Sequence, residues 1–211
     1  NGSIQLTGQL PYLFGMKIAI VKYNAGNNFS VLCALHRLGV EAHLTDSPEA
    51  LRAADKVIFP GVGEAASAMA YLRERKLDQV IKSLTAPVLG ICIGQQLLCR
   101  HSDEGDTDCI GIFDVDVRGF DAASTGLRIP HMGWNTLTDI KDGFIPHEVE
   151  NCHVYYVHSY YAPVCQWTAA ETDYIVPFSA ALHRNNFYAT QFHPEKSAGT
   201  GHLILKSFLE L

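Results

Sequence analysis

The stretch VLGICIG, residues 88–94, decides how this chain folds. Its first four residues form a short apolar run after Pro87, which is typical of a buried strand. Residues 93–99 then have helical composition. A strand that turns directly into a helix, with the pattern G-x-C-x-G across the junction, is typical of a nucleophile elbow, which exposes the central side chain. The pattern therefore makes Cys92 the candidate nucleophile.

The two glycines of this junction, Gly90 and Gly94, have a physical explanation. A nucleophile held in a strained turn needs neighbours without Cβ atoms. At a helix N-terminus the dipole favours a thiolate, and backbone N–H groups can stabilise an oxyanion. The alternative is that Cys92 is an ordinary buried cysteine, because free cysteines are among the most buried residues. We assign the remaining cysteines to packing: Cys33, Cys99, Cys109, Cys152 and Cys165.

On both sides of the junction, the first half of the chain alternates β-branched runs with amphipathic helical stretches. This alternation predicts parallel strands joined by crossover helices. We expect strands over 17–23, 40–44, 56–59 and 88–91. We expect helices over 29–38, 65–84 and 93–99, and a further short helix that begins after an N-cap at Ser47.

Residues 110–191 have a different character, because Tyr, Phe, Val and Thr dominate and helical periodicity fades. This composition predicts antiparallel strands packed onto the first sheet, a last long strand over 187–192 and a closing helix over 201–211. The sequence therefore predicts an α/β fold with an open, mostly parallel, flavodoxin-like sheet flanked by helices, and with added antiparallel strands in its second half. We expect one domain over 16–211 and an expression-derived or disordered extension over 1–15.

Composition limits the function and the compartment. The chain has 211 residues, enough for one substantial core, and a formal net charge of −6, which argues against nucleic acid or an anionic membrane surface as partner. Six scattered cysteines without a signal peptide fit reduced thiols and a cytoplasmic location. The sequence has no C-x-x-C pair and no H-E-x-x-H, so we expect no metal and no cofactor.

A base for the thiol is found near the other end of the chain. Residues 191–195 read QFHPE, so His193 is followed two positions later by Glu195. If this segment is extended, the two side chains project to the same face and the carboxylate can orient the imidazole. Alone, this histidine would be read as a surface or core residue. With a cysteine elbow in the same α/β chain, a Cys-His-Glu triad becomes the better interpretation.

These residues resemble the class I glutamine amidotransferases, whose triad is a Cys in a G-x-C-x-G elbow and a downstream His-x-Glu. The resemblance covers nearly the whole chain from Met16. Four further segments are similar to the glutaminase subunits of imidazole glycerol phosphate synthase: YNAGN at 23–27, PGVG at 60–63, IPHMGWN at 129–135 and YVHSY at 156–160. The string PHMGWN is the most specific of them.

The resemblance implies a cytoplasmic enzyme of histidine biosynthesis that releases ammonia from L-glutamine. Its partner would be a cyclase subunit with a (β/α)₈-barrel fold, bound as a heterodimer, which uses the ammonia to make imidazole glycerol phosphate and aminoimidazole carboxamide ribotide. Water would protonate free ammonia and spoil it as a nucleophile, so a closed passage between the subunits is expected. The resemblance further implies that the loop 60–63 stays poorly set for oxyanion binding until the partner binds.

The family motifs assign roles to individual residues. The N–H groups of Ile93 and of the Val62–Gly63 region would hold the oxyanion. Substrate would contact Gly61, Gln96, Ser159 and Tyr160, with Gln95 as a competitor for the role of Gln96 and a buried strand pair as the alternative for Ser159 and Tyr160. The residues expected at or near the cyclase interface are Asn27, His131, Met132, Trp134, Asn135 and Lys196, and the alternative for Trp134 is a core residue.

Two other classes of protein stay open at this point. A redox-sensing or chaperone-like module with a cysteine elbow would explain Cys92, but neither the distant His193 and Glu195 nor the string PHMGWN. A binding protein with a relic triad is disfavoured, because all three triad residues are intact.

Overall fold

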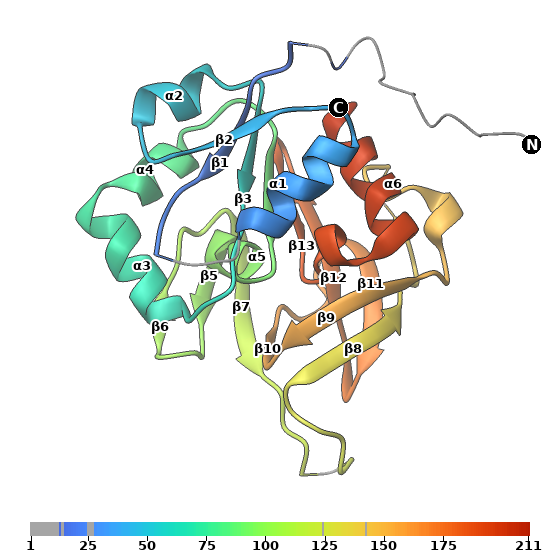
Figure 1. The fold of residues 1–211 in the computed structure, drawn as a ribbon. Coiled ribbons are helices and arrows are strands. Elements are labelled where there is room, and N and C mark those ends of the chain that lie inside the picture. Colours follow the sequence, from blue (N-terminus) through green and yellow to red (C-terminus); the bar gives the residue numbers. More distant parts are fainter. Residues whose placement is uncertain (1–12, 14, 25–27, 124, 142) are drawn as a thin grey trace, which may run out of the picture.

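The structure, a computed structural model, describes residues 13, 15–24, 28–123, 125–141 and 143–211. Its centre is a seven-stranded sheet with the strand order β11-β12-β13-β4-β3-β1-β2 (Figure 1). The bounds along that order are Thr168–Tyr174, Val176–Arg184, Phe187–Thr190, Val88–Ile91, Lys56–Phe59, Ile18–Val21 and Ala42–Thr45. Five neighbouring strands, from β13 to β2, run parallel, which confirms the predicted open, mostly parallel sheet.

The antiparallel additions differ in part from the prediction. Strands β11 and β12 extend the edge of the main sheet instead of packing onto it, and the last strand, β13, is parallel to β4 and ends at Thr190. The direction of β13 follows from a tight turn at Asn185, whose φ is 55°. Because β12 runs against β13, the reversal at this turn returns the chain parallel to β4.

The helices are α1 Asn28–Arg37, α2 Pro48–Ala53, α3 Ala65–Glu74, α4 Leu77–Lys82, α5 Ile93–Leu98 and α6 Ala198–Leu209. The predicted N-cap is confirmed, since the side chain of Ser47 accepts a hydrogen bond from the N–H of Ala50. The single helix predicted over 65–84 is wrong: Lys76 has φ 56° and separates α3 from α4. A left-handed residue interrupts the helical hydrogen-bond ladder, and the second helix then buries its own apolar face with Leu77 and Val80.

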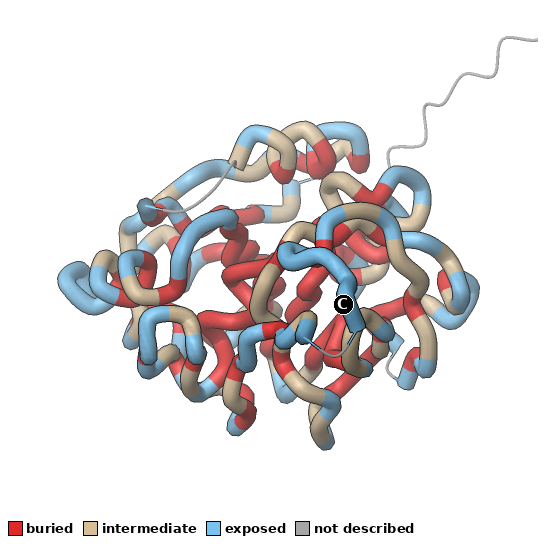
Figure 2. The backbone as a smooth tube through the Cα atoms, turned by 90° about the horizontal axis from the view of Figure 1, so that it is seen from below, coloured by how far each residue is buried: buried red, intermediate tan, exposed pale blue. Residues whose placement is uncertain are grey.

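Strand alternation divides the interior into two cores. Ile18 and Ile20 face the core that includes α1 and α6, whereas Ala19 and Val21 face the core covered by α2, α3 and α4. Figure 1 shows α1 and α6 side by side on one face, and Figure 2 shows the buried backbone between exposed outer helices. A side-chain period of two thus buries both faces of the parallel strands, and all four residues of β3 and of β4 are buried.

Two smaller sheets complete the fold. One has the order β10-β7-β5-β6, with bounds Tyr160–Tyr161, Phe113–Gly119, Cys99–Ser102 and Thr107–Asp108, so the helix predicted over 93–99 ends one residue earlier. The other is the hairpin of β8 His131–Thr136 and β9 His153–His158. Of the extension predicted over 1–15, only residues 13 and 15 are described. Leu13 is buried in the core that includes α1. Among the described residues, none of the helices has the length and apolar character to cross a membrane.

Candidate active site

Cys92 forms the junction between β4 and α5, and its backbone is strained, with φ 54° and ψ −109°. Such a conformation is costly for a residue with a Cβ and is maintained only by its surroundings. A Cβ on Gly90 would lie 2.8 Å from Leu98 Cδ1, and one on Gly94 would collide with the carbonyl oxygen of Phe59. The glycines therefore allow the elbow to pack closely, as the sequence predicts.

The sheet topology brings the second half of the site to this elbow. Strand β13 pairs in parallel with β4, with Thr190 beside Ile91, and the N–H of Cys92 donates to the carbonyl of Thr190 at 2.8 Å. The carboxyl ends of parallel strands meet at one edge of the sheet. His193, three residues after the end of β13, is therefore carried to the same edge as Cys92.

His193 and Glu195 form a buried pair, with 2.8 Å between Nδ1 and Oε1. The condition that this segment is extended is not met, because Pro194–Lys196 is a short 3-10 helix. The turn, not strand alternation, brings the carboxylate back to the ring. Burial alone would lower the pKa of His193, but the Cys92 sulfur and the Glu195 carboxylate outweigh it and raise this pKa to about 10. Nε2 of His193 has no hydrogen-bond partner among the described residues, and with Nδ1 engaged it is the atom left for the thiol.

A cavity of about 330 Å³ opens at the sulfur of Cys92. Most residues assigned to oxyanion or substrate binding line it, and the full lining is Val62, Gly63, Cys92, Ile93, Gln96, Glu104, Pro130, Val157, His158, Ser159 and Tyr160. Gly61 lies behind this wall, where a Cβ would meet the side chain of Ile93 and the hydroxyl of Tyr23. The hydroxyl of Tyr23 also contacts the loop 60–63, because it donates a hydrogen bond to the carbonyl of Pro60.

The two adjacent glutamines have different environments. Gln95 is completely buried and its Nε2 donates to the carbonyl of Ser179 at 3.1 Å, away from the cavity. Gln96 lines the cavity, and its Nε2 donates to the carbonyl of Tyr160 and to Oε1 of Gln191, each at 3.0 Å. Both amide protons of Gln96 are thus committed, so the atom it can offer a ligand is its oxygen. Of the two glutamines, Gln96 is the one that lines the cavity.

The sequence did not predict Glu104, which lines the same cavity. Its Oε2 accepts a hydrogen bond from the N–H of Ala65 at 2.8 Å, and burial raises its pKa. In the sequence this residue belongs to the polar run 102–106, which reads as an ordinary solvated turn. The only signal that could have pointed to it is its distance of twelve positions from Cys92, and such a spacing carries no meaning before the fold is known.

Strand β8 presents two faces. Met132 and Trp134 point outward with 64% and 53% of their surface exposed, so the alternative of a core Trp134 is wrong. His131 is buried, and Asn135 is half-buried with hydrogen bonds into the fold. Leu127 and Ile129, just before the strand, add exposed apolar surface. Of the other residues expected at the interface, Lys196 is half-buried in the 3-10 helix, and Asn27 lies outside the described residues.

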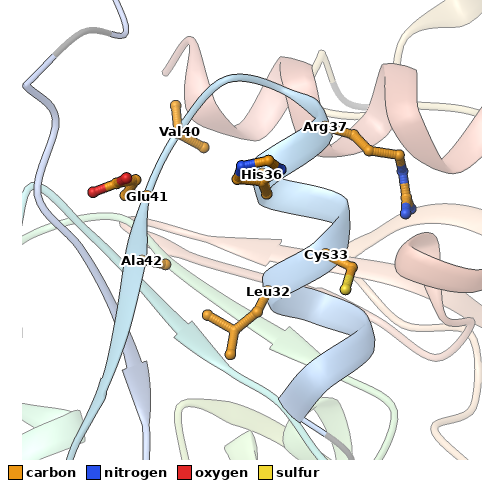
Figure 3. Close-up of a pocket in the computed structure, with 7 residues that line it drawn as sticks. All are labelled: Leu32, Cys33, His36, Arg37, Val40, Glu41 and Ala42. Carbon is orange, nitrogen blue, oxygen red and sulfur yellow. The ribbon is translucent and has the colours of Figure 1, made fainter.

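A larger hollow of about 570 Å³ lies elsewhere, between α1 and β2 (Figure 3). Figure 3 shows its lining residues on α1, on the connection that follows it and at the start of β2: Leu32, Cys33, His36, Arg37, Val40, Glu41 and Ala42. His36 and Cys33 lie on one helix there, but no hydrogen bond joins a nucleophile to a base among the described side chains that line this hollow. The volume of a cavity therefore does not identify the active site, and the candidate catalytic residues line or adjoin the smaller cavity.

Comparison with known proteins agrees with the fold. A family model described as glutamine amidotransferase class-I matches residues 16–211. The chain belongs to the class-I glutamine amidotransferase family.

Within that family it is similar to proteins named imidazole glycerol phosphate synthase subunit HisH. Identity to the HisH protein of Bacteroides fragilis (strain YCH46) is 59% over 196 residues, which cover 93% of this chain and 100% of that protein. Identity to the HisH protein of Escherichia coli (strain K12) is 43% over 198 residues, with the same coverage of 93% and 100%.

Solved structures support the fold alone, because their identities are low. A Thermoplasma acidophilum protein described as a candidate GMP synthase component has a TM-score of 0.72 at 20% identity, with 92% of each chain covered. PurLQS from Thermotoga maritima has a TM-score of 0.68 at 16% identity, covering 92% of this chain and 98% of that chain.

Proposed function

We propose that this protein hydrolyses L-glutamine to glutamate and ammonia, as the glutaminase subunit of an imidazole glycerol phosphate synthase. The observation that carries the proposal is the buried cluster of Cys92, His193 and Glu195 beside a cavity lined by acceptor groups. The identity of 59% to a HisH protein, over that protein's whole length, supports the specific assignment.

The first half of the reaction makes a thioester. The thiolate of Cys92 attacks the side-chain amide carbon of glutamine, and the N–H of Ile93 and N–H groups of the Val62–Gly63 loop hold the oxyanion that forms. His193, whose pKa is about 10, is protonated at neutral pH and gives its proton to the departing ammonia. The carbon–nitrogen bond breaks and a γ-glutamyl thioester remains on Cys92.

The second half releases glutamate. After it has given up its proton, neutral His193 accepts one from water, and the resulting hydroxide attacks the thioester carbonyl. The carbon–sulfur bond breaks, and glutamate leaves from the restored thiolate–imidazolium pair. Throughout, Glu195 accepts from Nδ1 and so holds the ring with Nε2 toward the sulfur.

Substrate recognition uses the acceptor groups of the cavity. The oxygen of Gln96 and the carboxylate of Glu104 offer acceptors to the α-ammonium group of glutamine. Ser159 and Tyr160 complete the contacts to the two ends of the substrate's amino-acid group. Gly61, expected among these contacts, acts instead by letting the loop 60–63 pack against Ile93. Replacing Gln96 by Ala should raise KM for glutamine, whereas Gln95→Ala should act on stability, and the reverse pattern would exchange the two assignments.

The ammonia then passes to a cyclase subunit with a (β/α)₈-barrel fold, bound as a heterodimer in the cytoplasm. The exposed side chains of Met132 and Trp134 fit an anchor for that partner, since protein interfaces are enriched in aromatic and methionine side chains. Asn27, His131, Asn135 and Lys196 would lie at or near the same interface. A closed contact keeps water away from the ammonia until it reacts.

The test is ammonia release from glutamine, measured with and without the cyclase and its ligand. Wild type should turn over, and faster in the complex, while Cys92→Ala should lose activity by about 10⁴-fold or more. Cys109→Ala, which alters a half-buried cysteine outside the cavity, is the matched control and should keep full activity. A wild-type complex that releases no ammonia, or a Cys92→Ala complex that still does, would overturn the proposal.

A further inference from the structure

Two buried histidines, His131 on β8 and His158 on β9, form part of a continuous series of hydrogen bonds. Nδ2 of Asn135 lies 3.3 Å from Nε2 of His131. Nδ1 of His131 lies 2.9 Å from Nε2 of His158, and Nδ1 of His158 lies 2.7 Å from the carbonyl oxygen of Tyr160. The series of hydrogen bonds therefore runs from β8, the strand of the proposed partner face, to the backbone of the candidate glutamine site.

Each hydrogen bond in this series can be donated in only one direction. The amide of Asn135 is oriented by two backbone groups, because its Oδ1 accepts from the N–H of Thr136 at 2.8 Å and its Nδ2 donates to the carbonyl of Asp173 at 3.0 Å. Nε2 of His131 must then accept, so its Nδ1–H donates to His158. At the other end the Tyr160 carbonyl can only accept, which requires the same Nδ1–H form of His158.

The surroundings keep both rings neutral. The ring of His131 is stacked between Tyr156 and Tyr174, with centroid separations of 4.8 and 3.9 Å. The ring of His158 lies 5.1 Å from Phe178, and no described carboxylate forms an ion pair with either histidine. Burial lowers the pKa of His131 to about 4 and that of His158 to about 3. A neutral ring has one donor and one acceptor, as the series requires.

The carbonyl of Tyr160 connects this series to the thiol. Its two lone pairs accept from His158 and from Nε2 of Gln96. The second amide proton of Gln96 goes to Oε1 of Gln191, whose own Nε2 lies 3.7 Å from the sulfur of Cys92. With both lone pairs of the Tyr160 carbonyl occupied, the direction in which the oxygen of Gln96 faces the cavity depends on where that carbonyl is held.

We propose that His131 and His158 are positioning residues for glutamine binding: they hold the carbonyl of Tyr160 and, through it, the amide of Gln96. The inference rests on the proposed function, because Gln96 is the substrate contact. Asn135 fixes the tautomer from the far side of β8, the strand that also carries Met132 and Trp134. The predicted partner face and the glutamine site are thus joined through one set of hydrogen bonds.

A matched pair of amide substitutions tests the role of His158. The Nδ2 of Asn superposes on the Nδ1 of His, so His158→Asn keeps the donor to Tyr160, whereas His158→Gln places its amide at the Nε2 position and loses that donor. We expect His158→Gln to raise KM for glutamine about tenfold, the usual effect of losing one hydrogen bond, with kcat changed much less. His158→Asn should stay within about threefold of wild type in KM. At His131, the same pair of substitutions should give the same order with smaller effects.

A purely structural role would give a different result. Asn is one methylene shorter than Gln and fills less of the ring's volume, so a packing role predicts that His158→Asn is the more disturbed variant. Equal KM values for the two variants, or a higher KM for His158→Asn, would overturn the proposal even if both have a lowered Tm. If wild type itself releases no ammonia while Cys92 is intact, the proposed function fails instead. An independent readout is ¹⁵N NMR of the side chains at pH 7: both rings should show protonated Nδ1 and bare Nε2, and a protonated Nε2 on either ring would contradict the inferred series.

Discussion

A histidine–glutamate pair, His193 and Glu195, and a histidine–histidine pair, His131 and His158, are both buried in this protein, and they illustrate opposite uses of one residue type. His193, His131 and His158 are nearly inaccessible, with 1%, 4% and 6% of their surface exposed. Yet the pKa of His193 is raised to about 10, whereas those of His131 and His158 are lowered to about 4 and 3. Burial lowers the pKa in all three rings, so burial cannot be the cause of the difference.

The difference comes from the partners of each ring. His193 lies between a carboxylate and a sulfur, both of which favour the imidazolium. His131 and His158 have each other, an amide and a backbone carbonyl as partners, all of them neutral. The first pair is therefore suited to moving a proton, and the second to holding a hydrogen-bond direction. Substitutions in each pair can test this division.

The largest expected effect separates the two histidines in kcat. His193→Gln removes the acid and base of the reaction and should lower kcat for ammonia release by about 10³- to 10⁴-fold. His158→Gln, the same change in the other pair, should leave kcat nearly unaltered and act on KM. Steady-state kinetics of both variants in complex with the cyclase measure this, and a similar loss of kcat in both would remove the distinction between the pairs.

The next effect concerns the carboxylate of Glu195. Glu195→Gln keeps the shape of the side chain but removes the charge that favours the imidazolium of His193, so the pKa of that ring should fall. We expect kcat to drop by about 10²-fold, because the ring loses both its orientation and its stabilised charge. Glu195→Asp, which keeps the charge at a shorter reach, should recover part of the rate. A Glu195→Gln enzyme with wild-type kcat would show that the pair is only structural.

Much of this arrangement can be predicted from sequence, and the exceptions share a physical cause. Strands β3 and β4 have the predicted bounds, because a short, fully buried apolar run between turn residues leaves little choice of state. The break at Lys76 could not be predicted, since no Gly or Pro marks it and tertiary packing selects the left-handed residue. The direction of β13 likewise depends on which strand it meets after the turn at Asn185.

The site divides in the same way. Cys92, His193 and Glu195 could be predicted from sequence as a candidate triad, because the G-x-C-x-G pattern and the His-x-Glu spacing are short local signals. The structure places His193 and Glu195 in contact, although a turn and not a strand joins them. Glu104 and Gln191 contribute through contacts formed only in the folded chain, with Ala65 and Gln96 respectively. Neither contact leaves a periodic or local signal. A residue that acts through long-range hydrogen bonds is therefore visible only in three dimensions.

A smaller effect is expected when the neutral pair receives a charge. Asn135→Asp replaces the amide nitrogen 3.3 Å from Nε2 of His131 by a carboxylate oxygen of the same shape. The pKa of His131 should rise by about one to three pH units, the usual effect of an adjacent opposite charge, and KM for glutamine should increase by a few fold. NMR titration of the ring measures the pKa. Asn135→Ala removes the donor without adding a charge and is the control, so an equal pKa in both variants would contradict the electrostatic explanation.

The smallest effect lies in stability against pH, where the two pairs should act at opposite ends. A raised pKa means that the folded protein binds the proton more tightly, so the contribution of His193 is complete below its ordinary pKa near 6.5 and is lost as pH rises through about 10. The lowered pKa values of His131 and His158 give a contribution that is complete above about 6.5 and is lost as pH falls toward 4 and 3. Tm measured from pH 4.5 to 9.5 should therefore fall at both ends of the range, which gives an acid limb and an alkaline limb.

Each limb can be removed separately by a substitution that cannot titrate. Relative to wild type, His193→Gln should flatten the alkaline limb, and His131→Asn the acid limb, by about 5 °C between neutral pH and the end of each range. Other carboxylates also titrate at acid pH, so the informative quantity is the difference between variant and wild type at each pH. Curves that run parallel to wild type throughout would mean that the rings keep their ordinary pKa values. The opposition between the two pairs would then have no thermodynamic basis.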